Sequence, residues 1–224
     1  MITLYHCVDA RSFRALWSLE EAGVPYKLEM LPFPPRWKAR EYLEINPLGT
    51  IPFFIDGAVT MTESSAISQY VAEKYAGAPF AVRPDEPAYG AYLNALHFGE
   101  ATLTFPQTIV LRYGKLEPPE RRLPQAVADY SKWALARAGQ LDRWLDGHDY
   151  VVADRFTAAD ISVGYALLLA RATGLYEKMS PTAHAYFDRL RERPAFKRAG
   201  AAQKKAAEEK GIALELPSAV STKS

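Results

Sequence analysis

The chain has 224 residues, of which 49% are hydrophobic and 24% are charged, which suits one large or two small domains with an ordinary apolar core. Its formal net charge of +1 gives no electrostatic attraction to nucleic acid or to an anionic membrane. The single cysteine, Cys7, cannot form an internal disulfide, which favours a cytoplasmic location. No signal-peptide pattern opens the chain, and its longest apolar run, residues 161–170, is too short to span a bilayer.

The first elements alternate between strand and helix patterns. Residues 2–5 predict a strand, and residues 12–22 predict a helix with apolar side chains at helical spacing and Gly23 as its stop. Residues 26–31 predict a second strand. A strand, a helix and a strand in this order predict a parallel pair joined by a right-handed crossover.

A hairpin and two further helices complete this half of the chain. Residues 37–43 predict a short helix. Residues 53–55 and 59–61 predict a hairpin that turns at Asp56-Gly57, since glycine tolerates the positive φ of a tight turn. Residues 63–75 predict a helix, so the order of elements is β-α-β-α-β-β-α.

The second half of the chain has no convincing strand pattern. Glycine and prolines at Gly77, Pro79, Pro84 and Pro87 indicate a linker over residues 78–87, between a domain of residues 1–77 and one of residues 88–210. Residues 211–224 predict a loosely ordered tail. Helices are predicted over residues 89–112 with a kink at Pro106, and over residues 123–145, 161–173, 181–193 and 194–210.

The segment Asn46-Pro47-Leu48-Gly49-Thr50-Ile51-Pro52, followed by Glu63-Ser64, carries the clearest functional signal. It combines a backbone edge at Ile51 with a helix start at Ser64, and the first amides of a helix have no partner inside it. Such a helix start binds a carboxylate well. Together the two features suit a small extended peptide with a free carboxylate.

A second motif, Phe156-Thr157-Ala158-Ala159-Asp160-Ile161, predicts the start of a buried helix. Thr157 is suited to cap the helix, and Asp160 lies three residues further on, where a carboxylate favours the helix dipole. We interpret Thr157 and Asp160 as structural residues.

These motifs, in this order, resemble those of the cytosolic glutathione S-transferase superfamily, although no class can be assigned. The segment at 46–52 resembles the loop before the family's cis-proline, Glu63-Ser64 resembles its acidic-serine pair, and residues 156–161 resemble its capping motif. The resemblance implies an α/β thioredoxin-like N-terminal domain plus an all-α C-terminal helical domain. It also implies glutathione as co-substrate and a homodimer.

The resemblance assigns roles in glutathione binding. Pro52 would be cis, so that the Ile51 backbone pairs with the cysteinyl unit of glutathione like an added strand. Ser64 would bind the γ-glutamyl carboxylate, and Glu63 would meet the ammonium group. A basic side chain on the second helix would meet the glycyl carboxylate; Lys38 is the best positional match, with Arg36 and Arg40 as rivals.

The residue that stabilises the thiolate does not follow a familiar pattern. The serine of two family classes aligns with Asp9, and the cysteine of another aligns with Arg11. Our hypothesis is that the Ser12 hydroxyl or amide donates to the sulfur, with Arg11 adding positive potential and Tyr5 as the runner-up. The structural alternative is that Ser12 caps the helix, that Cys7 is a small buried hydrophobe, and that Arg11 and Arg14 are surface charges.

The second substrate is expected between the two domains, in a pocket that suits an aromatic or polycyclic electrophile. The leading hypothesis is therefore a transferase that adds the glutathione thiolate to an apolar electrophile. A glutathione-dependent isomerase, for example of a steroid double bond, or an ether-cleaving lyase is an alternative, and a non-catalytic glutathione- or hydrophobe-binding module is another. The four histidines show no metal-ligand spacing. The predicted pocket residues are Phe105, Ile109, Tyr113, Tyr165 and Leu169.

Overall fold

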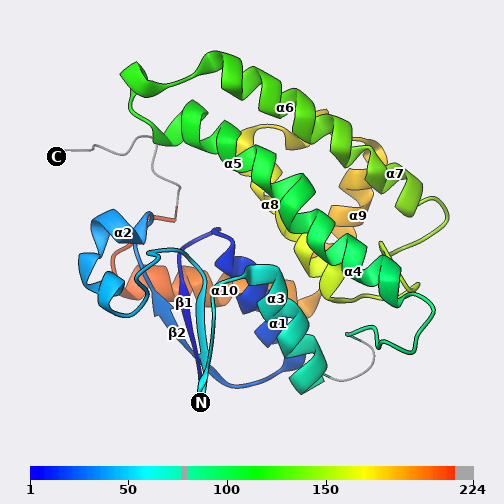
Figure 1. The fold of residues 1–224 in the computed structure, drawn as a ribbon, viewed down its shortest axis with the longest axis horizontal. Helices are drawn as coiled ribbons and strands as arrows, with labels where there is room; N and C mark the ends of the chain where they lie inside the picture. Colours follow the sequence, from blue (N-terminus) through cyan, green and yellow to red (C-terminus); the bar gives the residue numbers. More distant parts are fainter. Residues whose placement is uncertain (77–79, 215–224) are drawn as a thin grey trace. The chain divides into compact units, whose positions relative to one another are not determined.

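The computed structural model describes residues 1–76 and 80–214 (Figure 1). Its contacts form two compact units. The described residues of Met1–Arg83 and Arg191–Leu216 make up the sheet unit, and Pro84–Leu190 makes up the helical unit. Residues 77–79, which include the first two positions of the predicted linker 78–87, and residues 215–224 of the predicted tail 211–224 lie outside the described residues.

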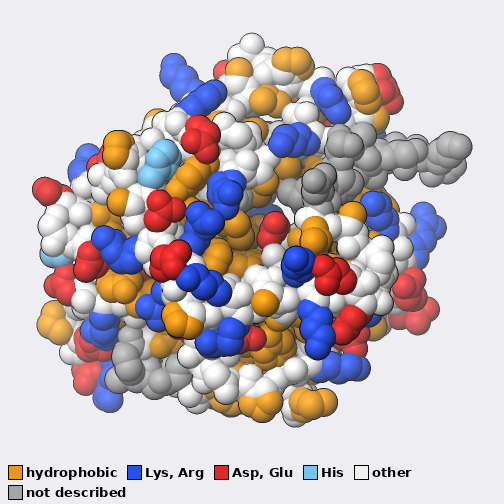
Figure 2. Space-filling view, turned by 180° about the vertical axis from the view of Figure 1, so that it is seen from behind, with side chains coloured by type: hydrophobic (Ala, Val, Ile, Leu, Met, Phe, Trp, Pro, Cys, Tyr) orange, Lys and Arg blue, Asp and Glu red, His pale blue; other side chains and the backbone are white. Residues whose placement is uncertain are grey.

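Basic and acidic side chains are interspersed over the visible face of the space-filling view rather than separated by sign (Figure 2). This distribution agrees with the formal net charge of +1. Over the described parts of the chain, no helix has the length and apolar character needed to cross a membrane. In the same residues, no group of three or more His, Cys, Asp or Glu side chains is arranged to hold a metal ion.

The sheet unit contains four strands in the order β2-β1-β3-β4. The pairing of β1 with β2 is parallel, as predicted, and the other two pairings are antiparallel. Side chains alternate between the faces: Leu4 and Phe54, which pair across the sheet, are both fully buried. The strand bounds are β1 Ile2–His6, β2 Tyr26–Met30, β3 Phe53–Asp56 and β4 Val59–Met61.

Helix α1 (Ser12–Ala22) ends where predicted, because Gly23 adopts a positive φ of 64°. The helix predicted over residues 37–43 instead divides at Ala39, whose φ of −144° interrupts it. The helix predicted over residues 63–75 is α-helical only at first and then becomes a π-helix. The observed bounds are α2 Pro35–Lys38, the 3-10 segment η1 Arg40–Glu44, α3 Ser64–Val71 and the π segment η2 Ala72–Ala76.

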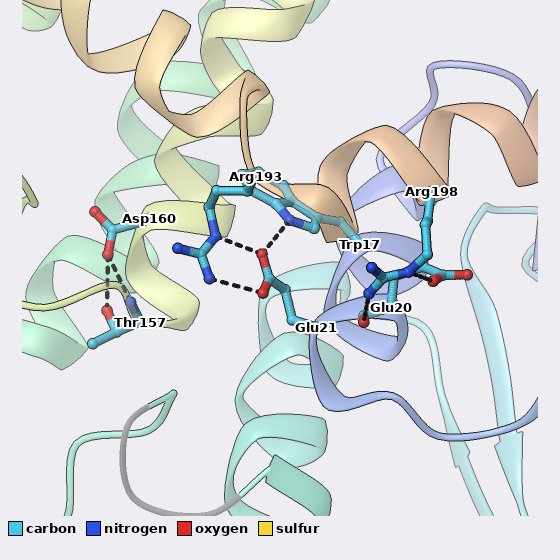
Figure 3. A network of polar contacts seen from close by, with 7 residues as sticks. All are labelled: Trp17, Glu20, Glu21, Thr157, Asp160, Arg193 and Arg198. Carbon is cyan, nitrogen blue, oxygen red and sulfur yellow. Dashed lines mark hydrogen bonds and ion pairs between the residues drawn. The ribbon is translucent and has the colours of Figure 1, made fainter.

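Helix α10 (Pro194–Glu209) belongs to the sheet unit, whereas the sequence grouped it with the helical domain. It packs against α1 and β2 through a face of mostly small side chains. Arg193 also binds both carboxylate oxygens of Glu21, at 2.7 and 2.9 Å, and Trp17 Nε1 donates to the same carboxylate (Figure 3). Arg198 similarly binds Glu20. These contacts explain why the last helix joins the first unit.

The helical unit is built from shorter helices than the sequence predicts. The stretch predicted over residues 89–112 is interrupted by the π segment η3 (Phe98–Thr104), directly before the expected kink at Pro106. Gly99 of this segment lies close to α8, because a Cβ there would be 2.4 Å from Ser162 Oγ. The observed bounds are α4 Tyr89–His97, α5 Phe105–Leu111, the π segment η4 Arg112–Leu116, the 3-10 segment η5 Pro119–Arg121, α6 Pro124–Ala138, α7 Gln140–Trp144, α8 Ala158–Thr173, the 3-10 segment η6 Tyr176–Lys178 and α9 Pro181–Arg191.

The buried helix α8 begins with the predicted capping box. Thr157 Oγ1 accepts from the Ala159 amide, and the Asp160 carboxylate accepts from the Thr157 amide at 2.8 Å (Figure 3 shows the Thr157–Asp160 pair). Asp160 also accepts from Val151 N–H and from Tyr186 O–H. Burial raises the pKa of Asp160 to about 6. Asp160 therefore joins the helix start, the preceding loop and α9.

Candidate functional site

The registers of the sheet bring three predicted parts of the site to one end. Tyr5 pairs with Phe53 in the β1–β3 ladder, so extending that ladder brings Cys7 opposite Ile51. Phe54 pairs with Met61 in the β3–β4 ladder, so the same extension brings Ser64 to the level of Ile51. The turn after β1, the Ile51–Pro52 bond and the start of α3 therefore lie at the same edge.

The loop before Ile51 is held by its own side chains. Asn46 Nδ2 and Tyr42 O–H both donate to the Thr50 carbonyl, at 3.0 and 2.7 Å. Gly49 has a φ of 60°, and a Cβ there would lie 2.8 Å from Arg36 Cβ, so this position requires glycine. These contacts fix the backbone that leads into Ile51.

The Ile51–Pro52 peptide bond is cis, as predicted. Within residues 1–76 and 80–214, neither the N–H nor the C=O of Ile51 has a hydrogen-bond partner. Pro52 is buried, while Ile51 is half-buried. This geometry leaves a backbone donor and acceptor at the sheet edge, where an extended peptide is able to pair.

Ser64 is buried at the first residue of α3, and Arg14 Nη1 donates to its Oγ at 3.1 Å. Arg14 is 0% exposed, so its interpretation as a surface charge was wrong. It comes from the buried face of α1, where a guanidinium adds positive charge to the start of α3. The sequence offered one signal for this role, because Arg14 lies between the apolar residues Phe13 and Leu16.

The remaining predicted glutathione contacts are on the surface. Glu63 precedes α3 in an extended conformation and is exposed. Lys38 and Arg40 are exposed, and the Arg36 guanidinium lies 4.6 Å from the centre of the Trp37 ring. The choice of Lys38 over its two rivals stays a prediction.

The Ser12 hydroxyl is committed to the turn between β1 and α1. Ser12 is 0% exposed, and its Oγ accepts from the Cys7 amide at 3.3 Å. The hydroxyl therefore turns inward, which leaves the Ser12 amide as the remaining form of the predicted donor. Arg11 precedes α1 and is half-buried. Cys7 is buried, and this burial raises the pKa of its thiol above the usual range.

Tyr5 is part of an aromatic cluster on one face of the sheet. Its ring centre lies 5.5 Å from that of Tyr42 and 6.1 Å from that of Phe53. This packing favours a supporting role for Tyr5 beneath the site rather than a role as thiolate donor.

A buried network around Gln203 was not found from the sequence. Gln203 of α10 forms hydrogen bonds with His6 and with Asp9, which lies in the turn after β1 and has a φ of 50°. Asp9 therefore has a partner for its carboxylate. A signal did exist: Gln203 is the polar member of a series with Ala195, Ala199 and Ala207 at four-residue spacing.

The predicted second-substrate residues separate into two groups within the helical unit. Phe105, Ile109 and Tyr113 recur every four residues and are exposed or half-buried, whereas Tyr165 and Leu169 are 2% and 4% exposed in α8. Tyr113 borders a groove of about 850 Å³. The groove is also lined by Gly114, Arg122, Pro124, Val127, Ala128, Ser131, Lys132, Leu135, Ala136 and Lys178.

Comparison with known proteins shows similarity to glutathione S-transferases. The model of the "Glutathione S-transferase, N-terminal domain" family matches residues 4–79. Glutathione S-transferase 3 of Schizosaccharomyces pombe is 27% identical over 87% of this chain and 85% of its own length. The glutathione transferase URE2P6 from Phanerochaete chrysosporium, solved with oxidized glutathione, is 26% identical with a TM-score of 0.78, over 92% of this chain and 97% of the other.

A further solved structure, Ure2p5 from Phanerochaete chrysosporium cocrystallized with 1-(S-glutathionyl)-2,4-dinitrobenzene, is 25% identical. Its TM-score is 0.78, over 94% of this chain and 96% of the other. The thioredoxin-like sheet unit, the helical unit and these matches agree with the motifs found in the sequence. Residues 4–79 match the N-terminal domain model of the glutathione S-transferases, and over most of its length the chain is similar to members of that family.

Proposed function

We propose that this protein is a glutathione transferase that ionises the thiol of glutathione and adds it to an apolar, aromatic or polycyclic electrophile. The observation that carries the proposal is the convergence of the unpartnered Ile51 backbone and the buried Arg14–Ser64 pair at one edge of the sheet, among the residues that the structure describes. An extended tripeptide with a carboxylate at its end complements both features.

In this proposal, the Ile51 N–H and C=O pair with the cysteinyl unit, and the start of α3 binds the γ-glutamyl carboxylate through Ser64. Glu63 meets the ammonium group, and Lys38 meets the glycyl carboxylate. The sulfur then lies beside residues 11 and 12. The Ser12 amide, Arg11 and the positive end of the α1 dipole stabilise the thiolate, which is the attacking species.

The acceptor site is proposed along the α5 residues Phe105 and Ile109 and the η4 residue Tyr113. Their i, i+4 spacing forms one accessible stripe, which suits a flat apolar molecule. The glutathionyl-dinitrobenzene complex of the relative Ure2p5 supports an aromatic electrophile as the first substrate to test. Tyr165 and Leu169 would support this stripe from the core.

The test combines thiolate absorbance with chlorodinitrobenzene conjugation. We expect wild-type protein to lower the pKa of bound glutathione and to form the conjugate. Ser64→Ala should weaken glutathione binding about tenfold, since a hydrogen bond to a charged group contributes about 1.5–3 kcal/mol. Ser131→Ala, the same chemical change on α6, serves as the control for glutathione binding.

The alternatives give different results in the same assays. Turnover of a substrate without consumption of glutathione would indicate the isomerase or lyase. Tight binding of glutathione with the thiol pKa of the free tripeptide would indicate a non-catalytic binding module. Failure to bind glutathione at all would refute the proposed site.

We also propose that the protein is a cytoplasmic homodimer with a role in detoxification. Apolar side chains exposed on the sheet unit support self-association: Trp37, Leu43, Ile45 and Leu48 are 44%, 36%, 43% and 67% exposed. Light scattering of wild type and Leu48→Glu tests the dimer. A wild-type protein that is monomeric at micromolar concentration would refute it.

A further inference from the structure

Gln203 is a polar side chain on an otherwise small and apolar helix face. It is 9% exposed, and the members of the same four-residue series, Ala195, Ala199 and Ala207, are at most 3% exposed. Alanine at these positions permits close packing of α10 on the sheet unit, so a glutamine among them has a specific environment.

The Gln203 amide makes contacts with two residues at the end of β1. Its Oε1 accepts from the Asp9 amide at 3.2 Å and lies 3.0 Å from His6 Nε2. Its Nε2 donates to Asp9 Oδ1 at 2.7 Å. Both ends of one amide group therefore engage the turn that leads into α1.

These contacts fix the orientation of the amide and the tautomer of His6. The Asp9 N–H can only donate and the Asp9 carboxylate accepts, so the oxygen and nitrogen of Gln203 are assigned without ambiguity. Since Oε1 is an acceptor, His6 must carry its proton on Nε2. Burial lowers the pKa of His6 to about 4, which keeps the ring neutral near neutral pH.

The same contacts hold Asp9 in an unusual backbone conformation. Its φ of 50° lies in the left-handed region that residues other than glycine rarely adopt. The Ala10 amide then donates to the Cys7 carbonyl at 3.2 Å, and Phe13 donates to the Ala10 carbonyl at 2.8 Å, so the turn continues directly into α1. A change at Asp9 would therefore move the backbone of residues 10–12.

We propose that Gln203 is a positioning residue for the thiol end of the glutathione site, acting from the last helix through Asp9 and His6 to place the amides of residues 11 and 12. This inference rests on the proposed function, because those amides are where the sulfur would lie. It also gives the Asp9 carboxylate a role, since one of its oxygens accepts from the Gln203 amide.

Exchanging donor and acceptor tests the proposal. Gln203→Glu places two carboxylates opposite one another and so loses the 2.7 Å bond, whereas Asp9→Asn removes the charge but keeps an amide oxygen that can accept from Gln203 Nε2. The double variant Asp9→Asn/Gln203→Glu restores it in reverse, with the introduced amide donating to the introduced carboxylate. Gln203→Met removes all the contacts, and Gln125→Met on the exposed start of α6 is the matched control.

The measured quantities are the pKa of bound glutathione, kcat for chlorodinitrobenzene conjugation and the dissociation constant of glutathione. Gln203→Glu and Gln203→Met should raise the thiol pKa and lower kcat about tenfold or more, whereas Asp9→Asn should stay within about threefold of wild type. The dissociation constant should change by less than about threefold, because Ile51 and Ser64 lie outside the network. Gln125→Met should match wild type, and the double variant should recover most of kcat.

Two outcomes separate the inference from the proposed function. A wild-type protein that leaves the glutathione thiol at its free pKa would overturn both. A wild-type protein that lowers the thiol pKa, together with a Gln203→Glu variant and a double variant that behave alike, would overturn the inference alone. If Gln203→Met does not fold, Asp9→Gly breaks the same carboxylate bond in a residue suited to a φ of 50°, and an unchanged kcat in that variant would equally overturn it.

Discussion

Arg14 Nη1 donates to Ser64 Oγ across 3.1 Å, although the two residues are separated by 50 positions in the chain and both are buried. The bond joins α1 to the first residue of α3, where the proposed carboxylate site lies. A buried guanidinium is not replaceable by a smaller cation without loss of hydrogen bonds.

We expect Arg14→Lys and Arg14→Met to weaken glutathione binding about tenfold or more, with Arg14→Met the weaker binder, because the lysine keeps the charge. Isothermal titration with glutathione measures the effect, after thermal melting has shown that the variants are folded. Arg137→Met, on exposed α6, is the control. Folded Arg14→Met with wild-type affinity would contradict the role of this pair.

His6 should make the stability of the protein depend on pH. Its pKa is lowered from 6.5 to about 4, mainly by burial, so the unfolded state binds more protons between these values. The stability that comes from neutral His6 is complete above about pH 6.5 and decreases as the pH falls towards 4, by up to about 3 kcal/mol.

The measurement compares urea denaturation of wild type and His6→Asn across this range of pH. Asp160 contributes with the opposite sign, because its raised pKa of about 6 means that the native state binds the extra proton. This contribution cancels in the difference between the two proteins. A difference in unfolding free energy that stays constant from pH 7 to about 4.5 would show that His6 is not a buried neutral histidine.

Asp160→Ala should destabilise the helical unit by about 3 kcal/mol, because it removes a helix cap and leaves buried donors of Val151 and Tyr186 without their acceptor. Asp129→Ala on exposed α6, where the carboxylate accepts from Gln125, should cost less than about 0.5 kcal/mol. Chemical denaturation followed by circular dichroism gives both values. Equal losses in the two variants would refute the structural role of Asp160.

Alanine substitutions at two glycines with the same positive φ distinguish the cost of a steric clash from the cost of the backbone conformation. Gly49 and Gly57 both have a φ of 60°, but a Cβ at Gly49 would lie 2.8 Å from Arg36 Cβ and 2.9 Å from Leu43 Cδ2, while Gly57 has nothing within 4 Å. We expect Gly57→Ala to cost about 1 kcal/mol. Gly49→Ala should cost about 1–3 kcal/mol more and weaken glutathione binding, because the loop before Ile51 must move. Thermal melting and titration check this, and matching values for the two variants would contradict it.

Sequence patterns over a few residues predicted the elements that depend on contacts between nearby residues. The strands, the hairpin at Asp56-Gly57 and the cap at Thr157 depend on residues a few positions apart, and all are confirmed. The cis bond before Pro52 is also confirmed, although its prediction came from resemblance to the family. The length of the helices was predicted less well, because the π segment η3 depends on packing of Gly99 against α8.

The sequence pattern placed the candidate site at Ile51 and Ser64 but did not indicate the contacts that support it. Arg14 and Gln203 meet partners that are 50 or more positions away in the chain, and no periodicity within α1 or α10 indicates which partner a polar side chain finds. The Ser12 hydroxyl was expected at the thiol, whereas it accepts from the Cys7 amide, a local contact five positions away that the sequence pattern does not indicate. Long-range pairing thus decided which polar residues support the site.

The sheet unit is assembled from two segments of the polypeptide, because α10 follows the helical unit in the chain but belongs to the sheet unit. A ribosome therefore releases the strands and α1 long before it makes the helix that covers them. Until α10 has been synthesised, Trp17 and its neighbours are exposed to solvent. The intervening helices can fold during that time. Exposed apolar surface of this kind favours aggregation of the N-terminal segment. A truncation before residue 194 would remove α10 and leave the sheet unit without the helix that packs against it.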